Sequence, residues 1–304
     1  MNFWGNNEYN DGFSYGNWGG FNLLVKLNQR NPEVQNYHYD TIRFWVDEFD
    51  IDGIRLDAAD VLDFDFMRGL RRLANEVKPE FWLMGEVIHG DYSRWANPEM
   101  LHSVTNYELH KGLWSGHNDH NYFEIAHTMR RLQGLCHDTR LYLFSDNHDV
   151  ERIASILRDP SHLPVAYGLL FAMPGVPAVY YGSEWGILGR KADGDDALRP
   201  ALDHPESNRL TTWISRLAQA RRNSPALRHG SYRNVHLTNR QIIFERAVPG
   251  ERVLVAINAD SAPYTAHFDA GSGLAEDLIT GATHDFGGGS LLPPYSVSYW
   301  RTER

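Results

Sequence analysis

The chain has 304 residues, of which 42% are hydrophobic, so it can bury the core of one large domain and a smaller one, or of two domains. Its net charge of −10 at pH 7, without any block of like charge, argues against a nucleic-acid partner. A single cysteine, Cys136, excludes an internal disulfide and a thiolate metal cluster, and the lack of a signal peptide or a long apolar run predicts a cytoplasmic protein with no membrane partner.

The first 28 residues read as a loop region that is rich in Gly, Asn, Asp and aromatic residues. Only residues 23–28, LLVKLN, have an extended pattern. Five oxygen-bearing side chains near the start offer possible calcium ligands, although their spacing does not match an EF-hand: Asn6, Asn7, Glu8, Asn10 and Asp11. We favour a turn-rich loop, and therefore expect no cofactor, with calcium as the alternative.

From residue 29 to residue 229, helical patterns alternate with short apolar runs. The predicted helices cover residues 32–50, 65–77, 123–136, 163–173 and 208–223, and the predicted strands cover residues 51–57, 81–87, 103–107, 141–145 and 178–181. Strands that alternate with helices in this way pair in a parallel sheet. The sequence therefore predicts an α/β domain with five parallel strands.

The first of these helices carries a clear start signal and an apolar stripe. Asn31 and Pro32 mark its beginning, because proline suits the first helical turn. Apolar residues then recur at helical spacing and predict one buried face: Val34, Ile42, Trp45, Val46 and Phe49.

Residues 230–304 have a different character from the rest of the chain. Residues 241–247 and 252–258 are strand-like, and Pro249 and Gly250 lie in the turn between them, which predicts a hairpin. Residues 295–300 alternate as a final strand. This part is predicted to be a small antiparallel β domain.

Three predicted strands have an acidic residue at or just beyond their carboxyl end, namely Asp57, Glu86 and Asp149. Because the carboxyl ends of parallel strands meet at one edge of a sheet, we expect the three acids to form one site. Each acid alone is better explained as an ion pair at a strand end, whereas the three together favour a function.

The surroundings of these acids suggest different roles in cleaving a bond between sugars, which needs two carboxyl groups. Arg55 shares a strand face with Asp57 and should keep it ionised, which suits a nucleophile. Glu86 ends an apolar strand, so burial should raise its proton affinity, which suits a general acid. Asp149 suits stabilisation of positive charge in the transition state, and His148 can bond a sugar hydroxyl.

Five stretches of the sequence together resemble a known family. GIRLDAAD, GEVIHG, FSDNHD and GVPAVYYGSEWG resemble signatures of the α-amylase family of retaining α-glucoside hydrolases. LVKLN is similar to MPKLN, which is typical of the branch with neopullulanase, cyclomaltodextrinase and maltogenic amylase.

The resemblance implies a fold and a role for each candidate residue. The fold would be a (β/α)₈ TIM-barrel type that is incomplete, with about strands 4–8, followed by the β domain. Residues 1–28 would be a remnant of an inserted loop domain, residues 29–229 a partial catalytic barrel and residues 230–304 the β domain. Asp57 would be the nucleophile, Glu86 the acid and base, and Asp149 the group that favours the distorted ring, with Arg55 and His148 binding substrate.

The implied activity is retaining hydrolysis of α-1,4-glucosidic bonds in maltooligosaccharides, cyclodextrins or related α-glucans. Two alternatives stay open: an α-glucan transglycosylase, and a non-catalytic glucan-binding fragment that depends on a partner. A (β/α)₈ barrel needs eight strands to close, so five leave two uncovered edges. Three explanations stay open: a truncated sequence, a complementing N-terminal fragment that carries the missing strands, or a second copy of the chain.

Three local features leave the substrate preference open. Asp60 and Val61 stand near the position where many α-amylases have a Lys-His pair. Val87 and Ile88 follow Glu86 where the cyclomaltodextrinase branch often has a Trp. LVKLN differs from MPKLN at its first two positions.

Arg199 follows the last predicted strand. We expect it to be a solvated charge, with closure of the site through an ion pair with Asp193, Asp195 or Asp196 as the alternative.

Overall fold

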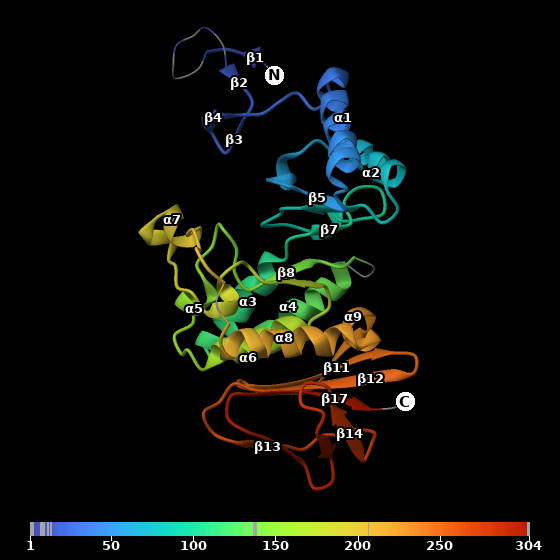
Figure 1. The fold of residues 1–304 in the computed structure, drawn as a ribbon, viewed down its shortest axis with the longest axis vertical. Coiled ribbons are helices and arrows are strands. Elements are labelled where there is room, and N and C mark those ends of the chain that lie inside the picture. Colours follow the sequence, from blue (N-terminus) through green and yellow to red (C-terminus); the bar gives the residue numbers. More distant parts are fainter. Residues whose placement is uncertain are drawn as a thin grey trace. The chain divides into compact units, whose positions relative to one another are not determined.

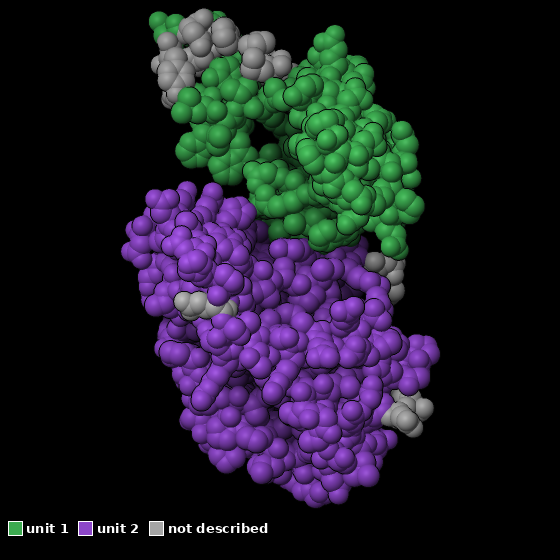
Figure 2. All heavy atoms as spheres, viewed as in Figure 1, with its two compact units in different colours: residues 1–105 green, residues 106–304 purple. Residues whose placement is uncertain are grey.

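The computed structural model describes residues 3–6, 10, 12, 14–135, 139–205 and 207–302, and it separates into two compact units (Figures 1 and 2). Unit 1 is Met1–Thr105, green in Figure 2, and unit 2 is Asn106–Arg304, purple in Figure 2. Cys136 lies outside the described residues. None of the described helices combines the length and the apolar character that a membrane span requires.

The described part of unit 1 contains four short strands, two long helices and a parallel sheet. Its elements are β1 (Phe3–Trp4), β2 (Ser14–Tyr15), β3 (Asn17–Trp18), β4 (Phe21–Val25), α1 (Pro32–Phe49), β5 (Gly53–Leu56), η1 (Ala59–Val61), α2 (Phe64–Val77), β6 (Trp82–Gly85), η2 (Tyr92–Arg94) and β7 (Ser103–Val104). β5, β6 and β7 pair in that order, all parallel, with Leu56 opposite Gly85. Three of the five predicted parallel strands therefore form this sheet.

Helix α1 begins and ends where the sequence predicted. The Asn31 side chain accepts a hydrogen bond from the Glu33 N–H at 2.9 Å, and Pro32 occupies the first turn. Asp50 adopts a left-handed conformation, with φ of 52°, and its N–H bonds the Val46 carbonyl at 3.0 Å. Both ends are therefore set by local chemistry.

The predicted buried stripe of α1 is wrong at its C-terminal end. Ile42 is buried, but Trp45 is 41% exposed and Phe49 is 62% exposed. α2 packs on the earlier turns of α1, where Tyr39 stacks on Phe66 with ring centroids 5.8 Å apart. Helical periodicity identifies an apolar face, but a neighbouring element must cover that face to bury it.

Unit 2 joins a helical part to an antiparallel sheet. Its elements up to residue 229 are α3 (Tyr107–Asn118), α4 (Tyr122–Leu135), β8 (Tyr142–Phe144), α5 (Ile153–Ile156), α6 (His162–Ala172), β9 (Val176–Ala178), η3 (Ser183–Trp185), η4 (Lys191–Asp193), α7 (Asp195–Leu198), α8 (Arg209–Arg222) and α9 (Pro225–His229). β8 and β9 form a parallel pair with Tyr142 opposite Val176. These are the other two predicted parallel strands.

The last parallel strand lies earlier in the chain than predicted. β9 ends at Ala178, where the prediction began, and it contains Pro177. Proline was expected to stop a helix before the strand. Pro177 has no N–H to donate to a neighbouring strand. It is tolerated inside β9 because β9 pairs only with β8 among the described strands, so no described strand on the other side of β9 loses a hydrogen bond.

The β domain is larger than the three predicted strands. It contains β10 (Ser231–Leu237), β11 (Gln241–Val248), β12 (Glu251–Asn258), β13 (Tyr264–Ala266), β14 (Leu274–Asp277), β15 (Thr283–Asp285), β16 (Ser290–Leu292) and β17 (Ser296–Thr302). Six of them form a sheet in the order β10-β11-β12-β17-β14-β15, and β13 pairs with β16. The predicted β11–β12 hairpin is confirmed, with Gly250 at φ of 86° in its turn.

Candidate active site

Two of the three predicted acids lie at the ends of neighbouring strands in unit 1. Asp57 directly follows β5 and Glu86 directly follows β6. Arg55 contacts both carboxyl groups: its Nη1 donates to Asp57 Oδ1 at 2.7 Å, and its Nη2 lies 3.0 Å from Glu86 Oε2. The structure therefore brings Arg55, Asp57 and Glu86 into one cluster around a single guanidinium.

The two carboxyl groups have different surroundings. The Asp57 side chain is 79% exposed, whereas the Glu86 side chain is only 10% exposed. Glu86 Oε2 also accepts a hydrogen bond from the Ala58 N–H at 3.1 Å. The two carboxyl groups therefore differ in their access to solvent, as the different roles of a nucleophile and a general acid require.

The turn after Asp57 has an unusual backbone. Ala58 has φ of 43°, a left-handed conformation that costs an alanine about 1–2 kcal/mol. The surrounding bonds hold it, because the Ala58 N–H donates to Glu86 Oε2 and the Ala59 N–H donates to the Glu86 carbonyl at 2.8 Å. The backbone strain next to Asp57 is thus maintained by the second acid of the pair, as is common at functional sites.

The third predicted acid, Asp149, belongs to a cluster in unit 2. His148 Nε2 lies 3.1 Å from Asp149 Oδ2, and Arg199 Nη2 donates to Asp149 Oδ1 at 2.9 Å. Arg199 Nε also donates to the His148 carbonyl at 3.1 Å, and Lys191 Nζ donates to the Asp149 carbonyl at 3.1 Å. Asp149 lies in unit 2 and the other two acids lie in unit 1, so a common pocket for all three stays a prediction.

Arg199 corrects one expectation from the sequence. It was expected to be a solvated charge or to pair with a nearby aspartate, but its partner is Asp149, fifty positions earlier in the chain. Its side chain is still 46% exposed. No local sequence pattern predicts this ion pair, because only the tertiary fold brings the end of α7 to the loop after β8.

Asp146 is a second residue whose place the sequence did not reveal. It is 1% exposed, and its carboxylate accepts hydrogen bonds from the Ile153 N–H at 2.8 Å, Ser183 Oγ at 2.7 Å and Ser145 Oγ at 3.2 Å. Burial raises the pKa of Asp146, which its hydrogen bonds partly offset. Asp146 supports the loop that carries His148 and Asp149 rather than facing solvent.

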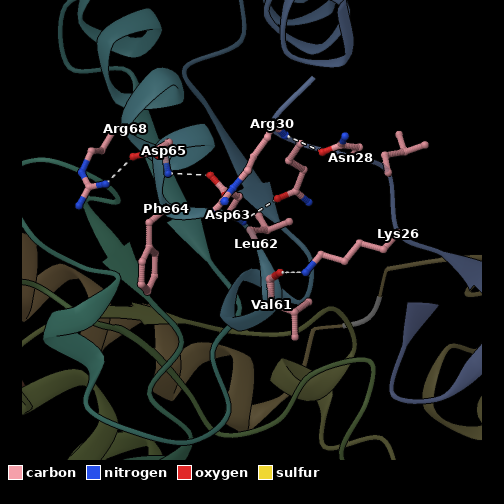
Figure 3. Close-up of a pocket in the computed structure, with 11 residues that line it drawn as sticks. Lys26, Asn28, Arg30, Val61, Leu62, Asp63, Phe64, Asp65 and Arg68 are labelled. Carbon is pink, nitrogen blue, oxygen red and sulfur yellow. Dashed lines mark hydrogen bonds and ion pairs between the residues drawn. The ribbon is translucent and has the colours of Figure 1, made fainter. Parts of the chain in front are cut away.

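A cavity of about 790 Å³ lies in unit 1 beside the start of α2 (Figure 3). It is lined by residues 26–30 and 61–65 and by Arg68. Its charges compensate one another: Arg30 Nε pairs with Asp63 Oδ2 at 2.8 Å, and Arg68 Nη1 pairs with Asp65 Oδ1 at 2.7 Å. Neither Asp57 nor Glu86 lines this cavity, so it does not contain the carboxylate pair.

The possible calcium ligands are described only in part. Asn7, Glu8 and Asp11 lie outside the described residues. Asn6 Nδ2 donates to Asn10 Oδ1 at 2.7 Å, and Asn6 Oδ1 accepts from the Gly12 N–H at 2.9 Å, as in a turn. Within the described part of the chain, no three His, Cys, Asp or Glu residues are grouped to hold a metal ion. Calcium binding stays an untested prediction.

Comparisons with known proteins identify relatives of this chain. Cyclomaltodextrinase of Thermoanaerobacter pseudethanolicus is 28% identical over 249 residues, which are 78% of this chain and 42% of that protein. Neopullulanase 2 of Thermoactinomyces vulgaris is 31% identical over 252 residues, which are 77% of this chain and 41% of that protein. The chain thus spans less than half the length of these two relatives.

Solved structures and a family model extend the comparison. A cyclomaltodextrin glucanotransferase of three domains superposes with a TM-score of 0.82 at 27% identity, covering 93% of this chain and 62% of that one. The fold is accordingly an incomplete (β/α)₈ barrel, followed by an antiparallel β domain. The model of the alpha-amylase catalytic domain matches residues 2–226. This chain therefore belongs to the alpha-amylase family.

Proposed function

We propose that the chain carries the catalytic acids of a retaining glycoside hydrolase that cleaves α-1,4-glucosidic bonds in maltooligosaccharides, cyclodextrins or related α-glucans. The observation that carries this proposal is the Arg55 guanidinium, which contacts both Asp57 and Glu86 at the ends of adjacent strands. The names of the two curated relatives, a cyclomaltodextrinase and a neopullulanase, support the substrate class.

In the proposed mechanism, Asp57 attacks the anomeric carbon while Glu86 protonates the leaving oxygen. Arg55 holds the Asp57 carboxylate in place through a charge-assisted hydrogen bond. Water deprotonated by Glu86 then hydrolyses the glucosyl ester on Asp57. Asp149 and His148 hold hydroxyl groups of the substrate and favour distortion of a sugar ring. In a retaining enzyme the Asp57 and Glu86 carboxyl groups should lie about 5–5.5 Å apart.

A product analysis tests this proposal. The chain is incubated with maltotetraose, and the anomer that forms first is followed by proton NMR. Two displacements at one carbon retain configuration, so the α-anomer should appear first. If the β-anomer appears first, the double-displacement assignment is wrong.

Transglycosylation is the second candidate, and the similarity to a cyclomaltodextrin glucanotransferase supports it. The same acids would serve, with a sugar hydroxyl replacing water in the second step. Products longer than maltotetraose in the same experiment would identify transfer. Binding of maltooligosaccharides without turnover would instead support the partner-dependent fragment.

We also propose that further strand–helix units complete the barrel around unit 1, either in the same polypeptide or on a second chain. Six large apolar side chains on β4, α1 and their flanks are more than half exposed: Phe21, Leu23, Leu24, Tyr37, Phe44 and Phe49. Exposed apolar side chains in this number are typical of a region that another element covers. Sedimentation measures the oligomeric state of the chain, and fluorescence of an apolar dye measures its exposed apolar surface. We expect a monomer that binds the dye. A dimer that does not bind the dye would indicate that a second copy of the chain covers this surface instead.

A further inference from the structure

Arg152 has no exposed surface and follows Asp149 by three residues in the loop after β8. Its Nη1 donates to the Tyr181 carbonyl at 2.6 Å and to Ser183 Oγ at 2.9 Å, and its Nη2 donates to the Leu198 carbonyl at 2.8 Å. One guanidinium therefore binds both ends of the segment 181–199.

The same segment supplies the cation that pairs with Asp149. Arg199 follows Leu198 directly, and its Nη2 bonds Asp149 Oδ1 at 2.9 Å. Two contacts thus join the same two short segments. Arg152 bonds Leu198 and Asp149 pairs with Arg199, so residues 149–152 and residues 198–199 form a closed ring. The Arg152 N–H also donates to the Gly189 carbonyl at 3.0 Å, inside the same segment.

A buried cation is tolerated only where several groups compensate its lost hydration. Arg152 lies over the Tyr180 ring, with its Cζ 4.1 Å from the ring centroid. Ser183 accepts from Arg152 and donates to Asp146 Oδ2 at 2.7 Å, which links the cation to a buried carboxylate. Asp146 in turn accepts from the Ile153 N–H, next to Arg152. Both Nη atoms of Arg152 are hydrogen-bonded, while its buried Nε has no partner among the described residues, and the Nη bonds together with the Tyr180 ring fix the guanidinium in place.

We propose that Arg152 is a positioning residue for the Asp149 carboxylate, because it fixes the segment 181–199 so that Arg199 meets Asp149. The catalytic part of this inference rests on the proposed function, since only that function gives Asp149 a role. The structural linkage between Arg152 and the Arg199–Asp149 pair does not depend on it.

Two variants of Arg152 test the linkage in the full chain. Arg152→Met removes the charge, and Arg152→Lys keeps the charge but cannot reach Tyr181 and Leu198 with one ammonium group. Arg221 provides the matched control. It is also buried, 7% exposed, and it bonds the carbonyl groups of Phe171 at 2.7 Å and Met173 at 3.0 Å, away from the Asp149 loop. Arg221→Lys and Arg221→Met are therefore made alongside.

The first readout is peptide hydrogen exchange together with the NMR signal of the Arg199 Nε–H, assigned through Arg199→Lys. In both Arg152 variants, residues 146–153 and 186–199 should exchange at least about tenfold faster, and the Arg199 signal should be lost by averaging. The Arg221 variants should affect residues 171–176 and keep that signal. The linkage would be overturned if the Arg199 signal persisted in Arg152→Met. It would also be overturned if residues 146–153 and 186–199 exchanged as slowly in that variant as in the unmodified chain.

The second readout is hydrolysis of maltotetraose by Arg152→Lys. A fall in kcat of at least about tenfold, with the fold retained, supports positioning of Asp149 for the reaction. If the exchange changes appear but turnover is unaltered, the linkage stands and the catalytic role of Asp149 is wrong. If turnover falls without any change at residues 186–199 or in the Arg199 signal, the positioning proposal is wrong while the proposed function stands.

Discussion

Asp57→Asn should abolish turnover of maltotetraose while the chain still folds. An amide is a far weaker nucleophile than a carboxylate, and loss of a catalytic nucleophile lowers kcat by roughly 10⁴-fold or more. The Asp57 side chain is 79% exposed, and removing an exposed ion pair costs at most about 1 kcal/mol of stability. Release of reducing ends measures the first effect, and urea unfolding measures the second.

Asp52→Asn is the matched control for Asp57→Asn. Asp52 precedes the other end of β5, and its 90% exposed side chain pairs with Lys78 Nζ at 2.6 Å. The substitution removes the same charge from the same strand and should leave turnover within a few fold. Retained turnover in Asp57→Asn, or an equal loss in both variants, would end the assignment of Asp57 as nucleophile.

Unit 2 should lose at least about 4 kcal/mol of stability between pH 7 and pH 5, because its buried histidines, His110, His117 and His162, resist protonation. Burial lowers the pKa of His117 to about 3, with His162 and His120 adding repulsion, and burial lowers the pKa of His110 to about 4. Both values lie below the ordinary value near 6.5, so the unfolded chain binds more protons than the folded one. Stability is therefore full above pH 6.5 and falls as the pH drops toward the folded pKa, by about 2 kcal/mol for each of His110 and His117 at pH 5.

Urea unfolding at pH 8, 7 and 5 measures this dependence. His117→Phe is the informative variant, because His117 is fully buried and a phenylalanine ring keeps its packing against Tyr122, whose centroid is 5.3 Å away. It should reduce the difference between pH 7 and pH 5 by about 2 kcal/mol. Between pH 7 and pH 8 the difference should be small, since the buried histidines are neutral in both states. An unchanged acid sensitivity in His117→Phe would contradict the assignment.

The sequence predicted those features of the fold that local chemistry determines. Asn31, Pro32 and Asp50 fix the bounds of α1 through caps that lie within a few residues of each helix end. The β11–β12 hairpin followed from the turn at Pro249 and Gly250 between two apolar runs. The Arg55–Asp57 contact followed from the two-residue repeat of a strand.

The features that the sequence did not predict depend on distant partners. Whether Trp45 and Phe49 are buried depends on what lies over α1, which periodicity does not reveal. Arg199 bonds Asp149 across fifty positions, and Arg152 bonds Leu198 across forty-six. β13, β15 and β16 are three residues long each, too short for an alternating pattern to stand out.

Trapping the covalent intermediate tests the central assignment most directly. A fluorinated α-glucosyl fluoride, whose fluorine slows the second step, is incubated with the chain, and the digested protein is analysed by mass spectrometry. One fluoroglucosyl group should be found on the peptide that contains Asp57, and none should be found in Asp57→Asn. A label on Glu86 or Asp149, or steady turnover with Asp57 unlabelled, would contradict the assignment.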